Sequence, residues 1–169
     1  MQYIFMLLLA GGIVAADQLT KLWVLRDIPL YGNVPVIPGV FSLTYIQNRG
    51  AAWGSFQGMI WLFAIIFALF TIGVIWEFSK KRMPFKTFDR WCIAAIWAGG
   101  LGNMIDRIRM GFVVDMIKTD FMDFPIFNVA DCFITCGCIA LIVSLVFFNK
   151  DFWKDEKKQE EETEGTEEE

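Results

Sequence analysis

Long apolar segments constrain the fold of this chain more than any other feature. The segment from Gly58 to Trp76 contains 19 residues without a charged side chain, and about 20 apolar residues span the hydrocarbon core of a bilayer. Three other segments qualify if their polar ends lie at the membrane interface: Met1–Ala16 with its continuation to about Leu25, Trp91–Ile105, and Cys132–Phe148. The sequence therefore predicts an all-α membrane protein with four transmembrane helices.

Composition and charge separate a membrane body from a short tail. The chain is 56% hydrophobic, with a mean hydropathy of +0.47, which is too apolar for an ordinary soluble domain. Residues 150–169 hold ten acidic and four basic side chains, a net charge of −6, whereas residues 1–149 hold nine acidic and eleven basic, a net charge of +2. We expect a membrane domain over 1–149 and an acidic, disordered cytoplasmic tail over 150–169. The nearly neutral body offers no basic surface for nucleic acid.

The first apolar segment has a second interpretation, as a cleaved signal peptide. Val14-Ala15-Ala16 resembles a small-residue cleavage site, but the segment lacks a positively charged beginning. A retained helix keeps Asp17 and Lys21 as an i, i+4 pair on one face. We favour the retained helix.

The basic residues predict the orientation in the membrane. The turn between the second and third apolar segments is the most basic loop, so it should be cytoplasmic. Its basic residues are Lys80, Lys81, Arg82, Lys86 and Arg90. Four spans then place both termini in the cytoplasm and the loops around 26–57 and 107–127 on the outer side.

The two outer loops have different patterns. In residues 40–46, apolar Phe41, Leu43 and Tyr45 alternate with polar Ser42 and Thr44, which is typical of a strand with one wet face. We expect a small extracytoplasmic β-platform there. The second loop mixes aromatic residues with Asp and Lys, which favours an interfacial segment, with a short amphipathic helix as one form.

Two residue types limit the chemistry. The chain has no histidine, which excludes Ser-His and Cys-His nucleophiles and histidine-ligated zinc. The cysteines all lie in apolar segments, where small core residues are the simplest interpretation and no disulfide framework is indicated. They are Cys92, Cys132, Cys136 and Cys138.

Two aspartates stand out because each lies where an apolar segment meets a polar loop. Asp115 follows two valines, and Asp131 follows Asn128 at i+3 as the fourth span begins. Ionisable groups near hydrocarbon are functional candidates by default. Two carboxylates brought together share one proton, as in an aspartic protease. An alternative for the second motif is structural, with Asn128 capping the fourth helix and Asp131 at its N3 position.

Further polar residues converge on the same side of the membrane. Asn103, Asp106 and Arg107 lie at i, i+3 and i+4 on one face of the third span, and Asn48 ends the strand-like run of the first loop. A structural interpretation competes here too, because Asp106 with Arg107, like the pair in the first span, can form an interfacial ion pair.

These residues resemble the motifs of the lipoprotein signal peptidase (signal peptidase II) family. The resemblance covers about residues 10–145 and rests on five motifs in the same order. They are Asp17-Gln18-Leu19-Thr20-Lys21, the segment 48–54 (Asn-Arg-Gly-Ala-Ala-Trp-Gly), the segment 99–107 (Gly-Gly-Leu-Gly-Asn-Met-Ile-Asp-Arg), Val113-Val114-Asp115 and Phe127-Asn128-Val129-Ala130-Asp131. Trp53 departs from the pattern, since many members have phenylalanine there.

The resemblance implies an aspartyl endopeptidase of the bacterial cytoplasmic (inner) membrane. Such an enzyme removes signal peptides from prolipoproteins, cutting just before a diacylglyceryl-modified cysteine. The catalytic residues would be Asp115 and Asp131, one ionised and one protonated, with no metal or organic cofactor. The substrate-binding or site-shaping residues would be Asn48, Asn103, Arg107 and Asn128. The residues that hold the fold would be Asp17, Lys21 and Asp106. Its partners would be prolipoproteins and membrane lipid.

Two other classes of function remain open at this point. A small transporter or proton pathway also uses intramembrane carboxylates, although here the polar residues crowd one side of the membrane. A membrane scaffold would use the same Asp and Arg residues as structural links between helices.

Overall fold

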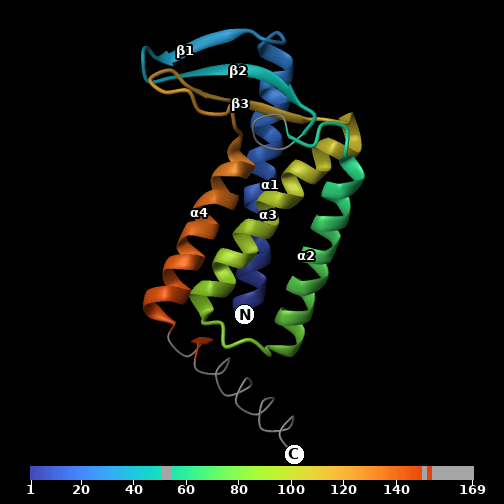
Figure 1. Ribbon diagram of the computed structural model, residues 1–169, viewed down its shortest axis with the longest axis vertical. Helices are drawn as coiled ribbons and strands as arrows, with labels where there is room; N and C mark the ends of the chain where they lie inside the picture. The colour runs from blue at the N-terminus through green and yellow to red at the C-terminus, as the bar shows by residue number, and fades with distance from the viewer. Residues whose placement is uncertain (51–54, 150–151, 154–169) are drawn as a thin grey trace, which may run out of the picture.

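Four helices form a bundle with a small sheet across one end (Figure 1). The computed structural model describes residues 1–50, 55–149 and 152–153. The helices are α1 (Gln2–Asp27), α2 (Ile60–Lys80), α3 (Thr87–Met110) and α4 (Val129–Val143), which continues into the π-helical turn η2 (Ser144–Phe148). The strands are β1 (Asn33–Ile37), β2 (Phe41–Asn48) and β3 (Val113–Thr119). The expected tail lies outside the described residues, apart from Phe152 and Trp153.

The predicted helices are all present. Three of them, α1, α2 and α4 with η2, are long and apolar enough to cross a membrane. The helix α3 is more polar, and it packs against the other three helices, as Figure 1 shows. Its polar groups are therefore shielded by neighbouring helices, which explains why a weakly apolar sequence occupies the centre of the bundle.

Small residues let the helices approach α3 closely. A methyl group at Gly99 would lie 2.6 Å from the carbonyl oxygen of Ala130, and one at Gly102 would lie 2.5 Å from Oδ2 of Asp17. Both positions need glycine because α4 and α1 occupy the space of a side chain. Small residues at such positions are typical of closely packed transmembrane helices.

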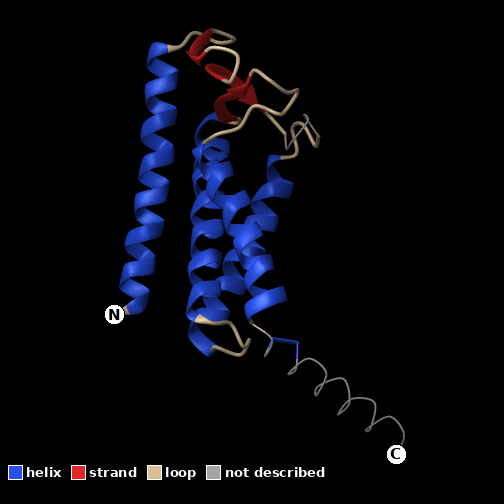
Figure 2. Ribbon diagram, turned by 90° about the vertical axis from the view of Figure 1, so that its left-hand side faces the viewer, coloured by secondary structure: helices blue, strands red, loops and turns tan. Residues whose placement is uncertain are grey.

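The sheet is antiparallel, with strand order β1-β2-β3. The predicted strand in residues 40–46 is confirmed by β2. The short amphipathic helix considered for the second outer loop is wrong, because Val113–Thr119 instead forms β3, which pairs with β2. Its β-branched valines favour extended backbone, and pairing satisfies the exposed hydrogen-bonding groups of β2. Figure 2 shows the sheet covering the ends of the helices.

An apolar cluster joins the end of α1 to the underside of the sheet. Its buried members are Val24, Ile28, Tyr45, Val114 and Met116. Burial of each such side chain stabilises the fold by about 1.5–3 kcal/mol. The cluster fixes β3, and hence Asp115, relative to α1.

A polar cluster closes the opposite end of the bundle. Asp89 is fully buried in the first turn of α3. Its carboxylate accepts hydrogen bonds from Ser144 Oγ at 2.5 Å, Asn149 Nδ2 at 2.7 Å and the backbone N–H of Lys86 at 2.7 Å. The bonds tie the beginning of α3 to η2.

The apolar cluster makes a testable contribution to stability. Met116→Ala should lower the free energy of unfolding by about 2–5 kcal/mol, because it leaves a cavity under the sheet. Unfolding in detergent measures this change. Ile65→Ala is the control, because Ile65 on α2 is 57% exposed; equal losses in the two variants would show that the cluster does not matter.

Candidate active site

The two predicted aspartates lie at the sheet end of the bundle, on β3 and in the first turn of α4. Asp131 is fixed by a reciprocal cap. Its backbone N–H donates to Asn128 Oδ1 at 3.0 Å, and the backbone N–H of Asn128 donates to Asp131 Oδ2 at 3.1 Å. The predicted helix cap is therefore confirmed.

One amide links the surroundings of both aspartates. Asn128 Nδ2 donates to Asp115 Oδ1 at 2.7 Å and to Asn103 Oδ1 at 3.1 Å. Asn103 Nδ2 in turn donates to Asp131 Oδ1 at 2.8 Å. The two carboxylates thus belong to a single hydrogen-bonded network in a largely buried site.

Asp115 is 3% exposed and accepts a hydrogen bond from a second amide side chain, on the neighbouring strand. Asn48 Nδ2 at the end of β2 donates to Asp115 Oδ2 at 2.9 Å. The pKa of Asp115 is raised to about 7. Burial is the main cause and the charge of Asp131 adds to it, whereas the hydrogen bonds from Asn48 and Asn128 oppose the shift. Asp115 is therefore poised to hold or release a proton near neutral pH.

Arg107 makes a different set of contacts from the asparagines. Its guanidinium donates to the carbonyl oxygen of Gly50 at 2.9 Å and to that of Asn103 at 3.3 Å. It also lies over the ring of Phe63, 4.4 Å from the centroid. Among the described residues, it therefore connects α3 to α2 and to the segment after β2. Residues 51–54 of the predicted motif lie outside the described residues.

The three predicted structural residues form one buried ionic cluster. Lys21 Nζ lies 2.8 Å from Asp17 Oδ2 and 2.9 Å from Asp106 Oδ2. The pairing of Asp17 with Lys21 is confirmed, but the alternative pairing of Asp106 with Arg107 is wrong. One reason is that α1 and α3 pack closely at Gly102, which brings the Lys21 ammonium to Asp106.

Gln18 belongs to this cluster, although the sequence interpretation gave it no role. Its Nε2 donates to Asp106 Oδ1 at 2.9 Å, to Asp17 Oδ2 at 3.2 Å and to the carbonyl oxygen of Gly102 at 3.2 Å. The sequence did contain a signal for this role, because Gln18 is a polar residue next to Asp17 within an apolar helix.

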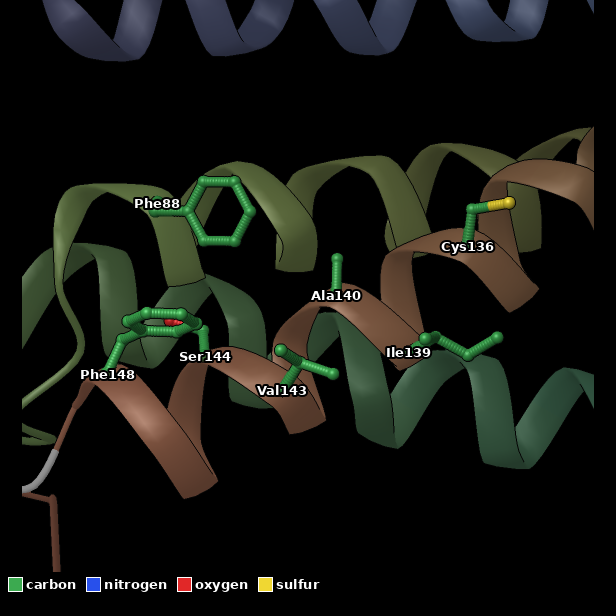
Figure 3. A pocket seen from close by; sticks show the side chains of 7 residues that line it. All are labelled: Phe88, Cys136, Ile139, Ala140, Val143, Ser144 and Phe148. Atoms are coloured by element: carbon green, nitrogen blue, oxygen red, sulfur yellow. The ribbon is translucent and has the colours of Figure 1, made fainter.

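An apolar groove of about 360 Å³ lies away from this site, along the later turns of α4 and η2 (Figure 3). None of the candidate site residues lines it. The lining residues are Phe88, Cys136, Ile139, Ala140, Val143, Ser144 and Phe148.

Comparison with known proteins identifies the class. The structure resembles a bacterial membrane enzyme solved by the in meso method at 2.3 Å, with a TM-score of 0.78 and 36% identity over 84% of this chain and 87% of that chain. A second such structure, at 1.9 Å, gives a TM-score of 0.77 and 36% identity over 85% and 94%. The fold is that of a bacterial membrane enzyme.

Sequence comparison gives the particular family. The family described as Signal peptidase (SPase) II matches residues 9–147. The lipoprotein signal peptidase of Lactococcus lactis subsp. cremoris (strain MG1363) is 44% identical, over 83% of this chain and 92% of the relative. That of Streptococcus pyogenes serotype M2 (strain MGAS10270) is 42% identical, over 85% and 90%.

The chain belongs to the signal peptidase II family, the membrane-embedded proteases that cleave signal peptides from prolipoproteins. This finding supports the peptidase interpretation of the sequence and not the transporter.

The bond from Asn48 gives a prediction about titration. Asn48→Leu should raise the pKa of Asp115 above about 7, because it removes a donor that favours the ionised carboxylate. Infrared titration of the carboxyl band, assigned by its loss in Asp115→Asn, measures the shift. Gln47→Leu is the control, since that amide donates to Tyr45 Oη. An unchanged or lower pKa in Asn48→Leu would contradict the assignment.

Proposed function

We propose that the chain is an aspartyl endopeptidase in which Asp115 and Asp131 form the catalytic pair. The observation that carries the proposal is the network in which Asn128 and Asn103 connect the two largely buried carboxylates. The chain contains no histidine, so a paired carboxylate is the group best suited to activate water.

The pair holds one proton in the reactive state, because two neighbouring carboxylates in a buried site resist carrying two charges. The ionised aspartate takes a proton from water, which attacks the scissile carbonyl. The protonated aspartate donates a hydrogen bond to the carbonyl oxygen and then supplies a proton as the intermediate collapses. The pKa of about 7 for Asp115 agrees with a pair that retains one proton at neutral pH.

The substrate is a prolipoprotein, cut just before its diacylglyceryl-modified cysteine. The aspartates lie at the end of a bundle whose outer helices are apolar enough for a membrane. A signal-peptide helix and its lipid-modified cysteine therefore reach the site without leaving the bilayer. The asparagines around the aspartates orient the carboxylates, and Arg107 shapes the site from α3.

The protein lies in the bacterial cytoplasmic membrane with both termini in the cytoplasm. The basic turn after α2 supports this orientation. The sheet and the catalytic pair then lie near the outer face, where the cleavage site of an exported lipoprotein emerges. Membrane lipid surrounds the bundle.

Replacement of either aspartate tests the proposal. Asp115→Asn and Asp131→Asn should each lower kcat for a diacylglyceryl-modified prolipoprotein by a factor of about 10²–10⁴ or more, because proton transfer is lost. Cleavage by purified protein in detergent is measured with folding matched by thermal melts. Asp123→Asn, in the exposed loop after β3, should cleave normally. Normal cleavage by a folded Asp115 or Asp131 variant would refute the pair.

The pH dependence gives an independent test. Activity should fall as pH rises above about 7, because the pair then loses the proton that the reaction requires. The dependence of kcat on pH between 5 and 9 measures this limb. Activity that stays constant up to pH 9 would contradict a shared proton held by Asp115.

A further inference from the structure

Lys21 lies at the centre of the polar network and has two more partners than an ion pair requires. The side chain is 1% exposed. Its ammonium has three N–H donors, and it has three acceptors: Asp17 Oδ2 at 2.8 Å, Asp106 Oδ2 at 2.9 Å and Asn103 Oδ1 at 2.9 Å. The third acceptor belongs to the residue that also binds Asp131.

The contact with Lys21 fixes which way the Asn103 amide points. An ammonium donates hydrogen bonds and accepts none, so Asn103 must present Oδ1 to it. Nδ2 of Asn103 must then point the other way, where it donates to Asp131 Oδ1 at 2.8 Å. The opposite orientation would place the Asn103 NH₂ group against the Lys21 ammonium and the Asn103 carbonyl oxygen against the Asp131 carboxylate. The charge of Lys21 therefore selects the orientation in which Asn103 donates to Asp131.

The two carboxylates bound to Lys21 also reach the backbone beside each catalytic aspartate. Asp17 Oδ1 accepts from the backbone N–H of Ala130, the residue before Asp131, at 3.0 Å. Asp106 Oδ2 accepts from the backbone N–H of Val114, the residue before Asp115, at 3.1 Å. The cluster therefore holds α4 and β3 at equivalent points.

We propose that Lys21 is a positioning residue for the catalytic pair, acting through the Asn103 amide, an inference that rests on the proposed function. Lys21 orients the Asn103 amide so that its N–H stabilises the Asp131 carboxylate. Its two carboxylate partners set the backbone on which Asp131 and Asp115 stand. Stability alone is a weak reason for such a cluster, because buried ion pairs often contribute little net stability.

The test separates orientation of the amide from compensation of charge. In the triple variant Asp17→Asn/Lys21→Met/Asp106→Asn, both introduced amides retain an oxygen for the Ala130 and Val114 N–H groups. The substitutions remove the ammonium that orients Asn103, the charges it compensates and the two carboxylate acceptors of Gln18 Nε2. Asn103→Leu and the combination of all four substitutions complete a double-mutant cycle.

The triple variant and Asn103→Leu should each lower kcat by about 10²-fold with little change in KM, because both misplace a reacting group. The combination should be no slower than Asn103→Leu alone, since Lys21 acts through that amide. Full kcat in a folded triple variant, or losses that multiply in the combination, would overturn the proposal.

The variant Asn103→Asp provides a second test. It leaves Lys21 in place and hardly changes the size of the side chain at position 103. Lys21 holds one oxygen of the introduced carboxyl, so the other oxygen faces Asp131 and must carry a proton to donate to it. The alkaline limb of the kcat–pH profile should therefore move to lower pH. An alkaline limb identical to that of the wild type would overturn the proposal even if the triple variant fails to fold.

Asp115→Asn, assayed beside these variants, distinguishes the two proposals. If Asp115→Asn is inactive and the triple variant has full kcat, the catalytic pair stands and the role of Lys21 falls. If Asp115→Asn cleaves normally, the catalytic pair falls, and the proposal for Lys21 falls with it.

Discussion

The ionic cluster around Lys21 is the interaction on which the rest of this structure depends. An ammonium buried in an apolar bundle is tolerated only when its donors are satisfied by acceptors of opposite charge. Asp17 on the same helix and Asp106 on α3 meet that need. Asp17 also accepts a hydrogen bond from the backbone of α4, and Asp106 accepts one from the backbone of β3. One buried charge thereby places four elements around the site.

The position of this cluster follows from close helix packing. Because Gly102 has no side chain, Asp17 occupies the space that a methyl group would fill there. The helix α3 lies among the other helices rather than facing lipid along its length. The outer helices present apolar faces to the surrounding membrane. The polar groups lie between the helices and beneath the sheet. The same arrangement offers a lipid-attached substrate an apolar approach and a polar site.

Much of this site was predictable from the sequence because its signals are local. Charge-free segments of 15 to 19 residues predicted the helices, and the i, i+3 spacing of Asn128 and Asp131 predicted the cap. The strand β3 was missed because both faces of its first half are buried, so apolar and polar residues do not alternate. The partner of Asp106 was missed because it comes from α1, 85 positions away, and no local pattern favours Lys21 over the adjacent Arg107.

The central claim is that Asp115 and Asp131 together bind the water that attacks the substrate. A crystal structure with an uncleavable prolipoprotein peptide, carrying a tetrahedral hydroxyl group in place of the scissile carbonyl, tests it most directly. The account predicts that the hydroxyl oxygen lies within hydrogen-bonding distance, about 2.5–3.0 Å, of a carboxylate oxygen of each aspartate. A peptide bound with its hydroxyl away from both aspartates would contradict the account.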